Sequence, residues 1–315
     1  MIEWQGFVLM VLGIFLSAIA TTVNKKLLGK NVPANLIGVV NMICGGLLLL
    51  VASGLFMPPT IESWLDWPRG LLWPLIITTL FNVVIQFGNI HALKHADASL
   101  VAPISAAQPM VVLIPAMLIL GEVPSATGYI GLFLIAFGTY LLAIGEQVYE
   151  EKGKPWVAPR WLAWTGEKAR YFAPVQMLFR NKGVKIAFVV ACSGAVAINV
   201  DKLVVLRSSS LFSAGLKFFM CGLIMLPTCL RSREYTQVSK ADLPMLLVNP
   251  FIFAIYLGLF ESSLYFGFAS YIGALKRTQT IVVLLLAYFF LGEVKAATRW
   301  RPAVVMVLGA ILLGF

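Results

Sequence analysis

The sequence carries few charged residues for its length. Only 12% of its 315 residues are Asp, Glu, Lys or Arg, whereas 60% are hydrophobic. A soluble domain has about 25% charged residues, because charges and other polar groups must cover its surface. This shortage excludes a soluble enzyme, a nucleic-acid-binding protein and a disordered chain.

Cysteine and histidine are also scarce. The four cysteines form no C-x-x-C pair and lie in or at the ends of apolar runs, which indicates packing and neither a disulfide framework nor a metal site. His91 and His95 have the spacing of two metal ligands on one helix face, but no further ligand accompanies them. We therefore expect no metal and no cofactor.

Long apolar runs dominate the chain. A transmembrane helix needs about 20 apolar residues, and only helices satisfy their own backbone groups in lipid. The runs fall at 5–24, 35–56, 71–92, 98–119, 126–145, 183–206, 211–230, 243–268, 274–292 and 300–315. The sequence predicts an all-α membrane protein with ten transmembrane helices. The first run ends in Asn24-Lys25-Lys26 and not at small residues, so we expect no cleaved signal peptide.

The two halves of the chain repeat each other. Residues 108–142 align without gaps on 279–313, and 14 of these 35 positions are identical. The identities include Leu120-Gly121-Glu122-Val123 and Leu291-Gly292-Glu293-Val294. Self-similarity of this kind indicates a duplicated structural unit.

The repeat predicts two five-helix units, residues 1–145 and 183–315, joined by an amphipathic segment, 146–182, at the membrane surface. Because five is odd, the second unit must enter the membrane in the opposite orientation. Inverted repeats are typical of transporters that alternate between two mirror-related states, with the solute site near the midplane.

The spaced pair of Leu-Gly-Glu-Val turns, each followed by a glycine-bearing helix, resembles the EamA-like branch of the drug/metabolite transporter superfamily. Asp201-Lys202 and Leu275-Lys276-Arg277-Thr278 are similar to features of one EamA subgroup. The resemblance covers nearly the whole chain. It implies a transporter, not an enzyme, that moves small organic molecules by alternating access without hydrolysing ATP.

Charged residues inside the apolar runs are candidates for the solute site, since a charge at the bilayer centre costs about 2.5–3.5 kcal/mol on insertion scales. Glu261 lies inside the eighth run, with Tyr265 one turn further on. Its alternative role is a structural ion pair with a lysine of another helix. Lys202 lies near the end of the sixth run, where an ordinary helix-end cation is the alternative.

Lys276 and Arg277 start the ninth apolar run. We expect them at a helix N-terminus, whose partial positive charge would help them to clamp an anion. The phosphate-translocating branch of the superfamily has a similar Lys-Arg pair. Snorkelling of both side chains to the interface is the alternative.

Amide side chains inside the runs form a second group of candidates. Gln108 and Gln279 occupy equivalent positions of the repeat, as do Asn82 and Glu261. Gln86 lies one turn beyond Asn82. Asn24, which precedes Lys25, is equivalent to Asp201 before Lys202. Such amides either contact the solute or join helix to helix.

The sequence therefore predicts a secondary transporter for a small anionic or zwitterionic solute, amino-acid-like or phosphorylated. Its expected partners are this solute and membrane lipids, with coupling to a proton or a counter-substrate, in a monomer or homodimer, and no nucleic acid. A flippase for lipid or polyprenyl-linked substrates, or a multidrug exporter, on the same fold is the alternative.

Orientation is predicted in two conflicting ways. Loops on the side of the 146–182 connector carry 18 Lys and Arg, and those on the opposite side carry 5. Basic loops stay in the cytoplasm, which would place both termini on the outer side of the expected membrane, the cell (inner) membrane. The family resemblance implies cytoplasmic termini instead.

Overall fold

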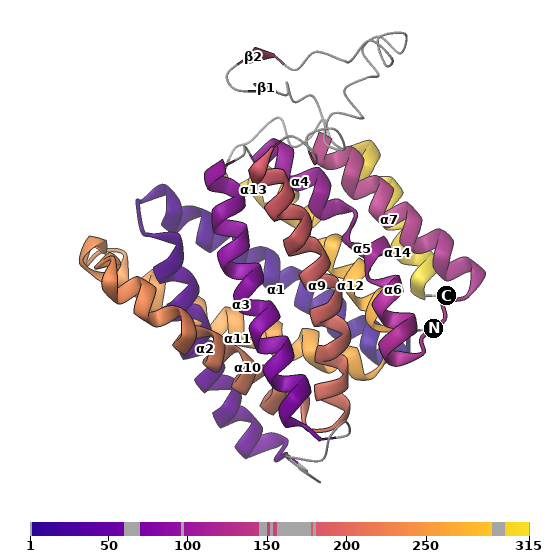
Figure 1. Ribbon diagram of the computed structural model, residues 1–315, viewed down its shortest axis with the longest axis horizontal. Helices are drawn as coiled ribbons and strands as arrows, with labels where there is room; N and C mark the ends of the chain where they lie inside the picture. Colours follow the sequence, from indigo (N-terminus) through magenta and orange to yellow (C-terminus); the bar gives the residue numbers. More distant parts are fainter. Residues whose placement is uncertain are drawn as a thin grey trace.

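The computed structural model describes residues 2–59, 70–95, 98–144, 150–151, 154–155, 178, 181–291 and 300–314. Helices form nearly all of it (Figure 1). The described strands, β1 (Glu150–Glu151) and β2 (Lys154–Pro155), make one short antiparallel hairpin. Most of the expected amphipathic connector, 146–182, lies outside the described residues, so its predicted surface location stays a prediction.

The helices follow the predicted apolar runs. The first half contains α1 (Trp4–Gly29), α2 (Ala34–Phe56), α3 (Leu72–His95), α4 (Ala98–Ala106), α5 (Gln108–Val111), α6 (Leu113–Pro115), the π-helical turn η1 (Ala116–Leu120) and α7 (Ala126–Ile144). The second half contains α9 (Lys182–Leu206), α10 (Ser210–Arg231), the 3₁₀ turn η3 (Glu234–Gln237), α11 (Leu243–Tyr265), α12 (Ala269–Arg277), α13 (Gln279–Leu291) and α14 (Trp300–Gly314).

Among the described helices, seven are long and apolar enough to cross a membrane, namely α1, α2, α3, α7, α9, α10 and α11. The chain is therefore a multi-pass membrane protein built from helices. Many large apolar side chains on the outer faces of these helices are exposed, as a lipid-facing surface requires. The expected total of ten spans is not established by this finding.

The fourth apolar run is broken, as its three prolines predict. Pro103 lies inside α4, Pro109 lies in the first turn of α5 and Pro115 ends α6. Each proline lacks the N–H group that an uninterrupted helix would need. Gly121 then ends the segment with a φ of 67°, a left-handed conformation that glycine adopts without a steric penalty.

The boundary between the eighth and ninth runs differs from the prediction. Helix α11 ends at Tyr265 and α12 already begins at Ala269, so Lys276 and Arg277 lie in the last turn of α12. The expectation that these two cations start a helix is wrong. The turn between the helices, Phe266-Gly267-Phe268, is itself mostly apolar, so the hydropathy pattern does not reveal where one helix ends and the next begins.

The helices pack in pairs that respect the sequence repeat. Helix α2 lies along α10, and α7 along α14, so each of these helices contacts its own repeat mate. Helix α1 lies along α11, and α3 along α9. Exchanging the two halves of the chain converts the α1–α11 contact into the α9–α3 contact. The packing therefore has the pattern expected of two related units that face each other.

Small residues bring α2 and α10 together. A Cβ atom on Gly46 of α2 would lie 2.6 Å from the backbone nitrogen of Phe219 and 2.9 Å from the carbonyl oxygen of Gly215, both on α10. Lipid tails compete with apolar side chains for helix surfaces, so close backbone approach is a main source of helix association in membranes.

We predict that Gly46→Val lowers the melting temperature of the purified protein, because the larger side chain must push α2 away from α10. Overpacking of this kind costs about 1–3 kcal/mol. Gly54→Val on the same helix is the matched control, since nothing lies within 4 Å of a Cβ atom there. Equal melting temperatures for the two variants would contradict the close packing described above.

Candidate functional site

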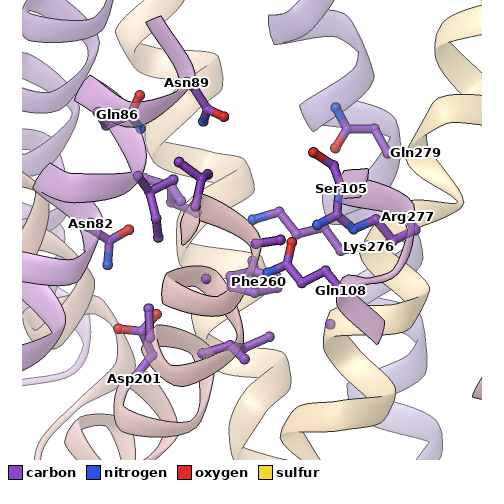
Figure 2. Close-up of a pocket in the computed structure, with 18 of the residues that line it drawn as sticks. Asn82, Gln86, Asn89, Ser105, Gln108, Asp201, Phe260, Lys276, Arg277 and Gln279 are labelled. Atoms are coloured by element: carbon purple, nitrogen blue, oxygen red, sulfur yellow. The ribbon is translucent and has the colours of Figure 1, made fainter. Parts of the chain in front are cut away.

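A cavity of about 420 Å³ lies between the two halves of the helical bundle. Side chains from α3, α4, α5, α9, α10, α11, α12 and α13 line it. Figure 2 shows amide side chains on one side, two cations on the opposite side and Asp201 at the lower end.

The amide side of the cavity comes from α3. Asn82, Gln86 and Asn89 follow one another at helical spacing, which places them on one face. The Asn82 amide donates hydrogen bonds to the carbonyl oxygen and the hydroxyl of Thr78, at 2.9 and 3.2 Å. These bonds fix the Asn82 side chain and leave its oxygen available to a solute.

The cationic side consists of Lys276 and Arg277 at the end of α12 (Figure 2). The Lys276 ammonium lies 4.1 Å from the centre of the Phe260 ring, an attractive cation–π distance. None of the ion pairs between described residues includes either cation. Two adjacent cations without a carboxylate partner form a region suited to a negatively charged group.

Two glutamines complete this side of the cavity. Gln279 is held against α1, because its side-chain oxygen accepts from the Ser17 hydroxyl at 2.7 Å and its nitrogen donates to the Thr21 hydroxyl at 2.8 Å. Gln108 lies against Gly194 of α9, where a Cβ atom would come within 2.5 Å of the Gln108 nitrogen. Each of these two glutamines therefore contacts another helix and also lines the cavity.

A buried cluster of charges lies at the lower end of the cavity. The Lys217 ammonium of α10 is 2.7 Å from Asp201 of α9 and 2.5 Å from Glu261 of α11. The Thr78 hydroxyl of α3 donates to Asp201. Glu261 is only 1% exposed and does not belong to the cavity lining, whereas Asp201 does.

Two members of this cluster, Lys217 and Asp201, are not among the site residues predicted from the sequence. Lys217 interrupts the apolar run 211–230, and this isolated charge is the signal that could have identified it. Asp201 directly precedes Lys202, and neighbouring residues of a helix point about 100° apart, so the two side chains face different surroundings.

Lys202 forms a different contact, away from the cavity lining. Its ammonium lies 2.5 Å from Glu122, at the turn before α7, and donates to the carbonyl oxygen of Gly267 at 2.7 Å. The other Glu122 oxygen accepts from the backbone N–H of Ala269 at 2.9 Å. These bonds join the first half to α9 and to the turn between α11 and α12. They hold the two halves together at this end of the bundle.

Asn24 lies in a second cavity, of about 280 Å³. Its side-chain oxygen accepts a hydrogen bond from Asn249 at 2.7 Å. Gln86, Phe253 and Tyr256 line both cavities, which are therefore neighbours. Tyr265 belongs to neither lining, is 60% exposed and has its ring edge-on to Phe266.

The structure thus brings part of the predicted site together. The predicted residues that line the main cavity are Asn82, Gln86, Gln108, Lys276, Arg277 and Gln279. The expectation that Lys202 and Glu261 border the same cavity is not met, since neither belongs to its lining. Lys202 is paired with Glu122, and Glu261 with Lys217. Among the described residues, no group of three or more potential metal ligands occurs.

The comparisons with known proteins agree with this architecture. The EamA-like transporter family matches residues 4–144 and 181–315, and the chain belongs to this family. A protein of known crystal structure is similar over 98% of this chain and 94% of its own, with a TM-score of 0.66 and 18% identity. At that identity the likeness concerns the fold alone. No curated protein matches the chain.

The chain is therefore a membrane transporter of the drug/metabolite type. Its family consists of transporters and not of enzymes. The resemblance drawn from the paired Leu-Gly-Glu-Val turns is confirmed.

We predict that Lys202→Met lowers the free energy of unfolding by about 3 kcal/mol, because it leaves the Glu122 carboxylate buried without its cation. Lys185→Met is the matched control, since Lys185 lies on the exposed face of the same helix. Thermal denaturation of the two purified variants measures the difference. A Lys202→Met protein as stable as the control would show that the ion pair does not hold this end together.

Proposed function

We propose that the chain is a secondary transporter that moves a small anionic or zwitterionic solute by alternating access. The observation that carries this proposal is the cavity in which Lys276 and Arg277 face the amide side chains of α3 (Figure 2). The cations would bind a phosphate or carboxylate through parallel hydrogen bonds. The amides, which both donate and accept, would bind the polar remainder of the solute.

The proposal includes ten transmembrane helices in two inverted units, residues 1–145 and 183–315. The contacts of α2 with α10 and of α7 with α14 support this arrangement, because repeat mates meet directly across an axis that relates the two units. An inverted repeat can adopt two mirror-related states that expose one central site to either side in turn.

The state described here supports alternating access. The bonds of Glu122 with Lys202 and Ala269 close the bundle at the end that holds the α11–α12 turn. The lining of the main cavity reaches Asn89, which is exposed and lies toward the other end of α3. A solute would therefore reach the cations from the end where the connector leaves α7.

A flippase on the same fold would need an apolar lateral opening into the solute cavity. An apolar groove does lie between α2, α10 and α11, lined by side chains such as Leu48, Leu211 and Ile255. It shares no lining residue with the main cavity, and its α11 residues alternate with those that line the cavity. A soluble polar substrate therefore fits this state better than a lipid, and nothing in the lining favours a multidrug exporter.

We predict that a thermal-shift screen of amino acids, phosphorylated sugars and nucleotide sugars will find an anionic or zwitterionic solute that raises the melting temperature. A ligand at a hundred times its dissociation constant adds about 2.7 kcal/mol of stability. Arg277→Ala should abolish this shift, and uptake into proteoliposomes, because the solute loses its bidentate partner.

Arg231→Ala is the matched control, since Arg231 lies exposed in the last turn of α10, outside the cavity lining. It should keep both the thermal shift and the uptake. Normal transport by Arg277→Ala would refute the anion-binding role.

We further propose that the protein lies in the cell (inner) membrane, with the connector in the cytoplasm and both termini outside. The prediction is that a single cysteine at Lys154, in a variant without the native cysteines, reacts with an impermeant maleimide only after lysis. The reason is the excess of basic residues on the connector side. Labelling in intact cells would establish the reverse orientation.

A further inference from the structure

The charge cluster below the solute cavity has an unbalanced composition. One ammonium, on Lys217, serves two carboxylates, on Asp201 and Glu261. All three side chains are buried, with exposed fractions of 3%, 8% and 1%. The cluster therefore holds one negative charge in excess, out of contact with bulk water, and such a charge is costly unless it is compensated.

The excess charge is located at Glu261. One of its oxygens accepts from Lys217, while the other, Oε2, is buried and has no hydrogen-bond partner among the described residues. Asp201, by contrast, has both Lys217 and the Thr78 hydroxyl as donors. A buried carboxylate oxygen without a donor is a place where a proton can be added without breaking an existing bond.

The groups around Glu261 come from four helices. The charged groups that act on it are Lys217 of α10, Asp201 of α9 and Lys276 of α12. Tyr256 lies on the same helix as Glu261 and lines the cavity. Lys276 is therefore the link between the cluster and the proposed solute position.

We propose that the Asp201–Lys217–Glu261 cluster is a proton-binding site whose occupancy is coupled to that of the solute cavity. A proton from water in the cavity would pass by Asp201, which lines it, and add to a Glu261 carboxylate oxygen to form the neutral acid. Lys217 would remain an ammonium paired with Asp201, so the cluster would become neutral. The coupling rests on the proposed function, whereas the proton site does not.

The sign of the coupling follows from Coulomb's law. The Lys276 ammonium lies 4.1 Å from the centre of the ring of Phe260, the residue next to Glu261, and its positive charge attracts a negative charge on that carboxylate. An anion bound to Lys276 and Arg277 would cancel that positive charge and favour the protonated form. Coupling between two binding sites is reciprocal, so the proton would also strengthen anion binding. Proton and anion would thus travel together, in the same direction.

The proton site can be tested without any solute by infrared spectroscopy of the full-length protein in lipid. Exposed carboxyl groups are ionised above about pH 6. We expect a carboxylic-acid carbonyl band that persists above this value and disappears at still higher pH. Both Glu261→Gln and Asp201→Asn should abolish it, because either change leaves Lys217 with a single carboxylate in a balanced pair.

Glu3→Gln, at an exposed position before α1, is the control that should keep the band. If one of the two cluster variants does not fold, the other gives the same test. A wild-type protein without the band, or a band that survives in a folded cluster variant, would overturn the proposal.

The coupling has its own test, in which Lys276→Gln imitates the loss of positive charge that a bound anion would cause. We expect the midpoint of the band to move up by about one pH unit. Lys240→Gln, in the exposed loop before α11, should leave the midpoint unchanged. An unmoved midpoint in Lys276→Gln would refute the coupling.

These measurements separate the two proposals. A proton band with the expected midpoint shift, in a protein that no anion stabilises or crosses, would leave the proton site intact and remove the proposed solute class. Anion transport by a protein without the band would do the reverse.

Discussion

The interaction on which this bundle depends is the contact of one lysine with two carboxylates inside the membrane. Lys217 carries a charge into an apolar helix, and Asp201 and Glu261 compensate it from two other helices. Thr78 adds a fourth helix through its bond to Asp201. These groups are buried among apolar helices, so leaving the cluster would cost each of them a partner, and α3, α9, α10 and α11 are held in this arrangement. At the lower end of the cavity, the positions of the helices therefore depend on these ion pairs more than on apolar packing.

Much of the fold could be predicted because apolar length and repetition are encoded locally. The run from 183 to 206 becomes α9, and the prolines of the fourth run become breaks in α4 to α6. The turn between α11 and α12 could not be predicted in the same way. Phe266 and Phe268 are as apolar as the helices on either side, and only the three-dimensional packing reveals that the chain reverses there.

The site was less predictable from the sequence than the fold. A polar residue inside an apolar run indicates that it needs a partner, but the sequence does not identify that partner. Gln279 and Asn82 combine bonds within the bundle with places in the cavity, and the sequence offered these roles as alternatives. The sequence predicts Glu261 in the cavity lining, whereas in the structure it lies outside that lining and forms an ion pair with Lys217. Partner choice depends on how helices rotate about their axes, and a hydropathy pattern does not specify rotation in a chain that is apolar on all sides.

The face of α3 that carries Asn82, Gln86 and Asn89 has a consequence for the charge preference of the proposed solute site. Amides donate and accept equally well, so this wall tolerates solutes of either sign. Asp201 is paired with Lys217, so in the proposed site Lys276 and Arg277 would set the charge of the preferred solute. Lys276 and Arg277 are consecutive residues of the short helix α12. Two neighbouring codons therefore encode both cations. Under the proposed function, substitutions at these two positions alone would change the charge of the accepted solute and leave the face of α3 and the helical bundle as they are.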